Sequence, residues 1–565
     1  MIDVKKEQER AELHAAIWKI ADDLRGSVDG WDFKAYVLGA MFYRFLSENL
    51  VDYLDANEHD AGNMLFRYAK IKDEEAEKLR AELVRDKGFF ILPSELFQNV
   101  VAGAKTNAEL NITLARTFRN IEQSAIGTAS EPNFRGLFGD FDVNSPKLGA
   151  TLEKKVETLR KILNGVDAMN LRYSHNTIDA FGDAYEFLMT MYASNAGKSG
   201  GEFFTPQEVS ELLAKIVVSG RKKIRTAYDP ACGSGSLLLK VAQEVENAEY
   251  LKFYGQEINL TTYNLCRINM ILHNVQYQNF DICNEDTLTS PSEYHSDLEP
   301  FEAIVSNPPY SISWKGDSDP ILINDPRFAP AGVLAPNSKA DLAFVLHSLA
   351  WLAPNGAAAI VCFPGIMYRS GKEQKIRRYL VANNFVDCVI QLPGNLFYGT
   401  SIATCVMVLR RNKKDNNVLF IDASREFAKV TNNNKLTPDN IAKIVGVYKS
   451  RETVEYFSRL VSYEEVREQD FNLSVSTYIE QKDEREQIDV VRLNREIREI
   501  VSRENELRDA IEKIVAEIEG NESGTASELP VKKTTGAKKT SGTNKRTTRK
   551  TARKTSQTPL IDEGN

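Results

Sequence analysis

Four residues, Asn307-Pro308-Pro309-Tyr310, have types and spacing suited to holding a flat group that carries an amino group. They follow a short apolar run, 303–305, that is typical of the end of a buried strand. Because neither proline has an N–H, the strand cannot continue through them and their carbonyls stay free. The Asn307 amide oxygen and a proline carbonyl can accept both amino protons, while the Tyr310 ring stacks on the group's face. The alternative is an ordinary turn at the end of a strand.

A second candidate site is the turn Asp229-Pro230-Ala231-Cys232-Gly233-Ser234-Gly235. A strand is predicted before it, over 223–228, and a helix after it, from Leu237. A turn of small residues between a strand and a helix lets the backbone approach a ligand closely. It also directs a helix N-terminus at that ligand, as in dinucleotide-binding proteins.

Two carboxylates follow the next predicted strands. Glu257 ends the strand at 253–256, where it is well placed to hold ribose hydroxyls, and Asp286 follows the strand at 280–283, where it can accept from an adenine amino group. For Glu257 the alternative is a solvated loop acid. Since Asn307 follows the fourth strand, four strand ends are predicted to meet at one edge of an open α/β sheet.

Two segments flank these motifs. In the segment Glu202-Phe203-Phe204-Thr205-Pro206-Gln207, Thr205 is the predicted N-cap and Pro206 the first residue of a helix that runs to Val217. The long loop 311–340 contains several prolines, and a loop of this length in a compact domain is usually functional. We expect it to act either as a lid or as a nucleic-acid contact.

The remaining pattern gives the domain organisation. Further strands are predicted at 357–362, 386–392 and 403–409, and the last two should pair antiparallel because the loop between them is too short for a crossover helix. The predicted division is an N-terminal helical domain (1–168), a catalytic domain (169–480), a long coiled-coil-like helix (481–520) and a disordered basic tail (521–565).

Composition limits the class of protein. The chain has 565 residues, of which 42% are hydrophobic and 27% charged, as in soluble globular proteins of two to four domains. It shows no signal peptide and no membrane-spanning run, so we expect a cytoplasmic protein. The six cysteines form no CxxC pair and no histidine lies at ligand spacing, so neither zinc nor disulfides are expected.

Charge is distributed unevenly along the chain. Residues 531–558 contain ten Lys or Arg and no acid, so the rest of the chain is more acidic than the net charge of −8 suggests. Such a body is a poor phosphate binder by itself, and a basic partner is expected to supply the missing contacts with nucleic acid.

Taken together, these motifs resemble those of an S-adenosylmethionine-dependent DNA methyltransferase that methylates amino groups. Phe203-Phe204-Thr205-Pro206, the turn 229–235 and Asn307-Pro308-Pro309-Tyr310 follow one another as in the modification subunit of type I restriction–modification systems. Residues 17–26 resemble that family's helical N-terminal domain, and the resemblance covers about 13–480. It implies a Rossmann-like methyltransferase sheet (fold class α/β) with an N-terminal all-helical domain, followed here by a C-terminal long helix.

The resemblance also implies roles for single residues. Asn307, Pro308, Pro309 and Tyr310 would hold a flipped adenine, whose N6 attacks the sulfonium methyl in line, and alignment carries much of the barrier lowering. Asn at position 307, in the family's pattern, fits adenine N6 better than cytosine N4. The residues that would hold S-adenosylmethionine are Glu202, Phe203, Phe204, Thr205, Pro206, Gln207, Asp229, Gly233, Ser234, Gly235, Glu257 and Asp286.

Partners are implied in the same way. The family leaves sequence reading to a separate specificity subunit, with two methyltransferase subunits for each, and DNA translocation to a restriction subunit. Two other functions stay open at this point. One is a protein-glutamine methyltransferase, which shares the Asn-Pro-Pro-Tyr signature, and the other is a non-catalytic subunit that binds the cofactor only for assembly.

Overall fold

The computed structural model describes residues 4–24, 28, 32–171, 176, 178–195, 205–397, 400–430, 433–481 and 490–521. The chain divides into two compact units, 1–482 and 483–565, which are described separately. Within the described ranges, no helix combines the length and the apolar character needed to cross a bilayer.

The first part of unit 1 is helical, as predicted. Its centre is α2 (Asp32–Asp60), which is buried along most of its length and packs against helices from several directions. Aromatic rings reinforce this core, for example Phe118 stacked on Phe138 with centroids 4.3 Å apart. The other helices are α1 (Val4–Asp23), α3 (Asp73–Ala76), α4 (Arg80–Lys87), α5 (Phe97–Gly103), α6 (Leu110–Ser124), α7 (Glu131–Phe134), α8 (Leu152–Asp167) and α9 (Ala180–Asn195).

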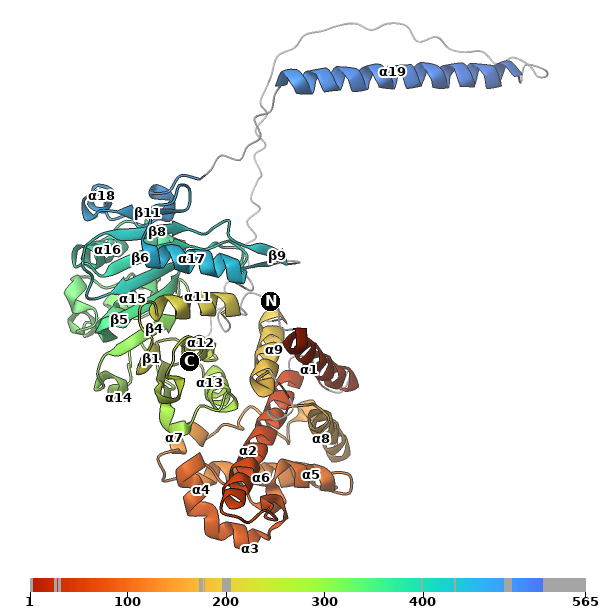
Figure 1. Cartoon of the computed structure of the whole chain (residues 1–565), viewed down its shortest axis with the longest axis vertical. Coiled ribbons are helices and arrows are strands. Elements are labelled where there is room, and N and C mark those ends of the chain that lie inside the picture. Colours follow the sequence, from red (N-terminus) through yellow and green to blue (C-terminus); the bar gives the residue numbers. More distant parts are fainter. Residues whose placement is uncertain are drawn as a thin grey trace, which may run out of the picture. The chain divides into compact units, whose positions relative to one another are not determined.

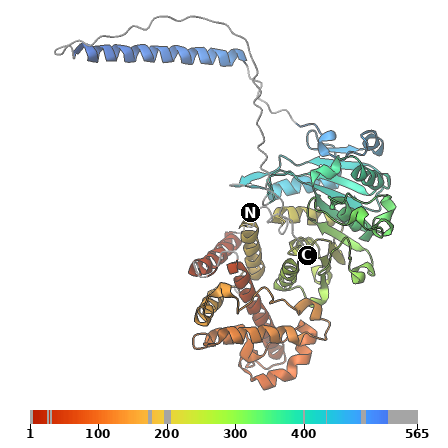
Figure 2. The same cartoon turned by 180° about the vertical axis from the view of Figure 1, so that it is seen from behind.

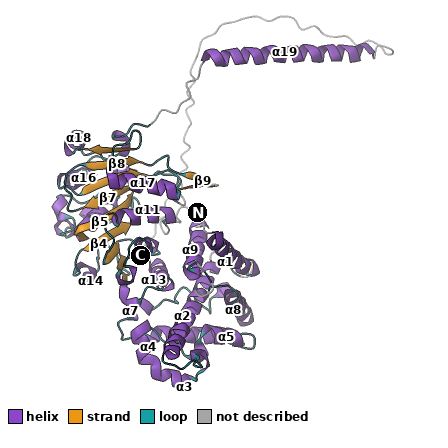
Figure 3. Cartoon of the chain, in the orientation of Figure 1, coloured by secondary structure: helices purple, strands orange, loops and turns teal. Residues whose placement is uncertain are grey.

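The second part of unit 1 contains a mixed sheet, which Figure 3 shows apart from the N-terminal helices. Among the described residues the sheet has nine strands in the order β11-β8-β6-β7-β5-β4-β1-β2-β3. The strands are β1 (Thr226–Asp229), β2 (Lys252–Gln256), β3 (Phe280–Cys283), β4 (Phe301–Ser306), β5 (Leu352–Cys362), β6 (Val386–Gln391), β7 (Cys405–Arg410), β8 (Val418–Asp422) and β11 (Ser458–Val461). A separate hairpin pairs β9 (Ala428–Val430) with β10 (Asn433–Lys435).

The pairing confirms the main topological predictions. β3, β2, β1, β4 and β5 are parallel neighbours, and β7 lies antiparallel between β5 and β6, as its short connection requires. The sequence reasoning did not predict β8 and β11, because their short apolar runs lie within the polar stretch 414–480.

Helices cover both faces of the sheet (Figures 1 and 2). The cluster that contains Ala227 and Val305 includes residues of α11, α12, α13 and α17, while the cluster that contains Tyr228 and Ile304 includes residues of α15 and α16. Neighbouring strand residues thus point to opposite faces. These helices are α11 (Gln207–Val217), α12 (Ser236–Gln243), α13 (Leu260–Leu272), α15 (Asp341–Trp351), α16 (Lys372–Ala382) and α17 (Pro438–Ser450), and the shorter α14 (Glu293–Ser296) and α18 (Tyr463–Glu468) complete the set.

The first of these clusters also includes the core of the N-terminal helices, so the helices and one sheet face share continuous apolar packing. The predicted division at residue 168 therefore stays a prediction.

Unit 2 contains one described element, the long helix α19 (Val490–Asn521), where a long helix was predicted. Its apolar side chains recur at intervals of three and four residues, except where Glu504 takes one position of the seam, and they are exposed: Leu493, Ile497, Ile500, Leu507, Ile511, Ile514 and Ile518. The tail predicted to be disordered, from residue 522 onward, lies outside the described residues.

Candidate active site

The predicted site residues gather at the carboxyl edge of the parallel strands. Because β1 pairs in parallel with both β2 and β4, and β2 with β3, the four strands end on the same side of the sheet. Asp229 ends β1, Glu257 directly follows β2, Asp286 lies three residues beyond β3, and Asn307 directly follows β4. The predicted meeting of four strand ends is confirmed.

The turn after β1 needs glycine at two positions. Gly233 and Gly235 have φ of 53° and 78°, in the left-handed region that favours glycine. A Cβ on Gly235 would also lie 2.8 Å from the Cys266 Sγ, so this position excludes a side chain. Gly235 is the N-cap of α12, and the carbonyl of Ser234 accepts from the Asn269 amide at 2.8 Å. The turn therefore presents backbone at the edge of the sheet.

Asp229 lies beneath this turn. Its Oδ1 accepts from the Ala231 N–H at 2.9 Å, and the residue is only 1% exposed. Burial, with a smaller contribution from the Glu257 charge, raises the pKa of the Asp229 carboxyl to about 7.

Glu257 connects two strand ends. One carboxylate oxygen accepts from the Gly233 N–H at 3.1 Å and the other from the Asn259 N–H at 2.8 Å. Burial raises the pKa of this carboxyl above its usual value. Glu257 thus holds the turn after β1 against the end of β2, with a lone pair left on each oxygen.

Asp286 organises the turn after β3. Its carboxylate accepts from the Leu288 N–H at 3.0 Å and from the Thr289 hydroxyl at 2.6 Å. The next residue, Thr287, donates to the Pro230 carbonyl at 2.5 Å, which joins this turn to the turn after β1.

The motif after β4 is held by side chains. The Asn307 amide donates to the Thr205 Oγ1 at 3.1 Å, and its Oδ1 accepts from the Tyr310 hydroxyl at 2.5 Å. The Tyr310 ring meets Phe397 edge-on, with centroids 6.5 Å apart. Pro308 is buried, whereas Pro309 is only partly buried. The Asn307 amide therefore has no backbone partner among the hydrogen bonds of the described residues.

The helix start near this motif differs from the prediction. α11 begins at Gln207 with Pro206 as its N-cap, so the assignments of Thr205 as N-cap and Pro206 as first helical residue were wrong by one position. The physical reason is that the Thr205 hydroxyl accepts from Asn307. Both amide atoms of Gln207 are buried without a hydrogen-bond partner in the described ranges. Glu202, Phe203 and Phe204 lie outside the described residues.

Sequence reasoning missed Arg327, which comes from the loop 311–340. Its guanidinium donates to the carbonyls of Thr287 at 2.6 Å and Leu288 at 2.9 Å, and it pairs with Asp325 at 2.7 Å. Phe328 is fully buried beside it. The loop is therefore anchored on the turn that contains Asp286, and the only sequence signal for this was the loop's unusual length.

The same network continues beneath the strand ends. His347 contacts the Arg327 Nη1 at 3.0 Å through one ring nitrogen and the Tyr228 hydroxyl at 2.8 Å through the other. Burial and the Arg327 charge hold the pKa of His347 well below its ordinary value, so the ring is neutral. The Tyr228 hydroxyl donates to Gln256 at 3.1 Å. Tyr228 and Gln256 directly precede Asp229 and Glu257, so one buried network supports three strand ends.

Comparison with known proteins agrees with this arrangement. The family model for the N-6 DNA methylase matches residues 176–487, and the model for the HsdM N-terminal domain matches 13–166. The type I restriction enzyme MpnII methylase subunit of Mycoplasma pneumoniae is 51% identical and covers 92% of this chain and 98% of its own. The MjaVII methylase subunit of Methanocaldococcus jannaschii is 30% identical, covering 87% and 82%.

A solved structure is similar over most of the chain. The type I restriction–modification system methyltransferase subunit from Streptococcus thermophilus superposes with a TM-score of 0.76 at 37% identity, covering 83% of this chain and 99% of its own. The chain therefore belongs to the N-6 DNA methylase family, as a methylase subunit of a type I restriction–modification system.

Proposed function

We propose that this chain transfers the methyl group of S-adenosylmethionine to N6 of an adenine turned out of the DNA duplex, at a site chosen by a separate specificity subunit. The observation that carries the proposal is that two of the predicted motifs lie next to each other at one edge of the sheet. Asn307-Pro308-Pro309-Tyr310 follows β4, and the glycine turn follows the adjacent β1. This arrangement supports a reaction between an amino group and a cofactor held side by side.

The residues present fit S-adenosylmethionine. Gly233 and Gly235 leave backbone accessible, while Glu257 and Asp286 offer carboxylate oxygens at the rim for ribose hydroxyls and an adenine amino group. The buried, unpartnered amide of Gln207 adds a donor and an acceptor. The other residues proposed to hold the cofactor are Glu202, Phe203, Phe204, Thr205, Pro206, Asp229 and Ser234. When bound, the cofactor supplies an electrophilic methyl group on a sulfonium.

The chain's own residues align the amino group. The Asn307 amide oxygen and the Pro308 carbonyl accept the two N6 protons, which directs the nitrogen lone pair away from both acceptors. The Thr205 hydroxyl accepts from the Asn307 amide nitrogen and so fixes the amide. The Asn307 amide oxygen is then the atom that faces the base. The Tyr310 ring stacks on the base, whose own stacking was lost on leaving the duplex. Positioning of this kind reduces the barrier without a strong general base.

The proposed partners are those that the family resemblance implies, and the charge and the exposed helix of the chain support them. Outside the C-terminal tail the chain is acidic, so contacts with DNA phosphates are proposed to come largely from the specificity subunit. The proposed complex has two copies of this chain on each specificity subunit. A restriction subunit is a further proposed partner. The exposed seam of α19 has the three-and-four spacing that a partner helix requires. The proposed division of the chain is an N-terminal helical domain (1–168), a catalytic domain (169–480), a long coiled-coil-like helix (481–520) and a disordered basic tail (521–565).

Transfer of a labelled methyl group tests the proposal. The full chain is incubated with labelled S-adenosylmethionine and DNA, with and without a candidate specificity subunit. Label on adenine that requires the partner is the expected result. Label on protein would favour the glutamine methyltransferase, and equal labelling by wild type and Asn307→Ala would contradict the catalytic role.

A further inference from the structure

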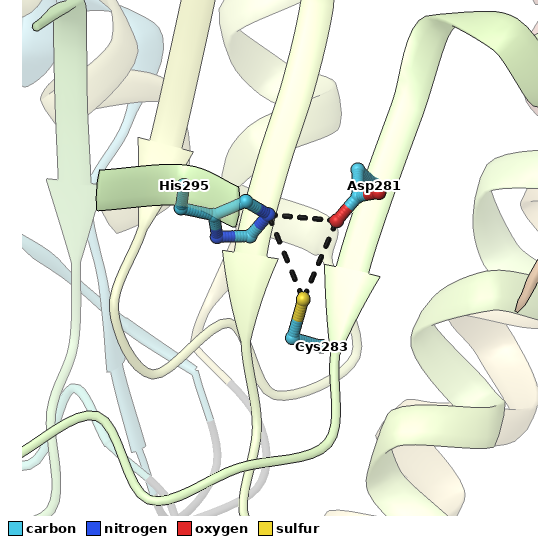
Figure 4. A group of neighbouring side chains, drawn as sticks. All are labelled: Asp281, Cys283 and His295. Atoms are coloured by element: carbon cyan, nitrogen blue, oxygen red, sulfur yellow. Dashed lines mark hydrogen bonds and ion pairs between the residues drawn. The ribbon is translucent and has the colours of Figure 1, made fainter. Parts of the chain in front are cut away.

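A cluster of three side chains lies on the edge strand of the sheet, outside the residues used above. Asp281 and Cys283 are two positions apart on β3 and so point to the same face, and His295 reaches them from α14 (Figure 4). Each of the three side chains offers one potential metal-ligand atom, and within the described part of the chain these three atoms all lie within 4.8 Å of one another.

The imidazole of His295 is fixed before any ion binds. The Ser292 hydroxyl accepts from the His295 N–H and caps α14, which sets the position of the residue. The rings of Tyr254 and Phe301 meet the imidazole edge-on, at 84° and 89°, and the side chain is fully buried. The His295 Nε2 therefore already points at Asp281 and Cys283. Because the imidazole is already held in place, binding of a metal ion would cost little conformational entropy at this residue.

Two of the three distances between the ligand atoms are close to the edges of a tetrahedron around a metal. The Cys283 Sγ lies 3.7 Å from the His295 Nε2 and 3.4 Å from the Asp281 Oδ1. Metal–ligand distances of about 2.3 Å to sulfur and about 2.0–2.1 Å to nitrogen or oxygen require tetrahedral edges of about 3.3–3.6 Å. The third edge, from Nε2 to Oδ1, is 2.7 Å because these atoms share a hydrogen bond, and an ion that replaces the proton would open it.

The cluster has an entry path and room for a fourth ligand. The Asp281 side chain is 37% exposed and borders a cavity of about 260 Å³, together with Tyr254 and Tyr294. A water from this cavity, or the Ser292 Oγ at 3.4 Å from the sulfur, can complete the coordination. An ion bound here would displace the proton of the Cys283 thiol, because the thiolate is the form that ligates a metal.

We propose that Asp281, Cys283 and His295 bind a borderline-soft divalent metal ion such as Zn²⁺. A thiolate and an imidazole favour zinc or cobalt over magnesium and calcium, which prefer oxygen ligands alone. The ion would tie β3 to α14, and β3 is joined in turn to the end of β2, because the Cys283 carbonyl accepts from the Glu257 N–H at 3.0 Å. The sequence expectation of no zinc relied on short spacings, whereas these ligands come from a strand and a later helix.

Metal titration of the full chain tests this inference. The chelator-treated protein is titrated with Co²⁺, whose thiolate charge-transfer band reports cysteine ligation, and then with Zn²⁺ as competitor. The expected result is one equivalent bound, with a thiolate band that Zn²⁺ removes and a higher Tm with Zn²⁺. Cys283→Ala should abolish the band. The control variant Cys388→Ala, which changes a cysteine on the distant strand β6, should retain it.

A second variant keeps the test decisive if Cys283→Ala fails to fold. Asp281→Asn keeps a hydrogen-bond partner for His295 but removes the anionic ligand, so metal affinity should fall at least tenfold while circular dichroism stays unchanged. Three results would overturn the proposal. They are the absence of a thiolate band in the wild type, a band of full strength in Cys283→Ala, and undiminished metal affinity in Asp281→Asn.

Discussion

The two halves of the sheet edge are held in different ways. At the ends of β1, β2 and β3, the carboxylates of Asp229, Glu257 and Asp286 accept from backbone N–H groups of the turns themselves. At the end of β4, the hydrogen bonds that the Asn307 amide forms within the described ranges go to the side chains of Thr205 and Tyr310. The half proposed to hold the cofactor (the cofactor half) is therefore fixed by backbone hydrogen bonds, whereas the half proposed to hold the adenine (the adenine half) can exchange a side-chain partner for a ligand atom.

Because of this difference, substitutions in the two halves should affect stability and catalysis to different extents. A change in the cofactor half removes partners from buried backbone groups and should weaken the fold as well as the site. A change in the adenine half leaves the backbone hydrogen bonds intact and should act mainly on the reaction. The following predictions test that contrast.

Asn307→Ala should give the largest effect on activity and a small effect on folding. It removes the oxygen proposed to align N6, so kcat should fall by about 10²–10³-fold, as for other positioned hydrogen-bonding groups at a reacting atom. The free energy of unfolding should change by no more than about 1 kcal/mol, because only side-chain partners are lost. Single-turnover methyl transfer and thermal unfolding measure the two, with Asn383→Ala, on an exposed amide, as control.

Arg327→Met should show the opposite pattern. It leaves the buried carbonyls of Thr287 and Leu288 without their donor and removes the guanidinium that pairs with Asp325, so unfolding should become easier by about 2–4 kcal/mol. Because these carbonyls flank Asp286, we expect KM for S-adenosylmethionine to rise more than kcat falls. Denaturant unfolding and steady-state kinetics measure both, and the exposed Arg378→Met is the matched control. A loss of kcat alone would contradict the assignment of Arg327 to the cofactor half.

Most of the cofactor half could be predicted from sequence because its determinants are local. Apolar runs gave the strands, and Asp229, Glu257 and Asp286 could be assigned to strand ends because each lies within three residues of one. The antiparallel β7 followed from a connection too short for a helix.

The rest depended on contacts between distant residues. Thr205 was predicted to cap α11, but its hydroxyl is taken by Asn307, 102 positions away. Arg327 carries no motif and becomes significant only when the fold brings His347 and the turn after β3 to it. The cluster of Asp281, Cys283 and His295 was missed for the same reason, since its ligands come from two elements.

The buried charge of Asp229 predicts how stability in the cofactor half depends on pH. The unfolded carboxyl loses its proton near its ordinary pKa of 3.8, whereas the folded one keeps it until about pH 7, so this group makes the protein less stable as the pH rises through that window. At about 1.4 kcal/mol per pKa unit over this window, the component is on the order of 4 kcal/mol.

Asp229→Asn should remove this component and flatten the profile between pH 4 and 7, because the amide oxygen still accepts from Ala231 without titrating. Urea unfolding at several pH values in that window measures it, with the exposed Asp439→Asn as control. A profile as steep as that of the wild type would mean that another group carries the pH dependence.

Tyr310→Phe should give the smallest effect and so tests whether the adenine half is exchangeable. The substitution removes the hydroxyl that donates to Asn307 Oδ1 but keeps the ring against Phe397. If the adenine N6 protons take the place of that hydroxyl during the reaction, its loss should lower kcat by less than about tenfold, the equivalent of one hydrogen bond. Tyr310→Ala, which removes the stacking face, should cost far more, and the exposed Tyr368→Phe should cost nothing. Equal losses in the phenylalanine and alanine variants would show instead that the hydroxyl itself sets the Asn307 amide, and that this half of the edge is as fixed as the other.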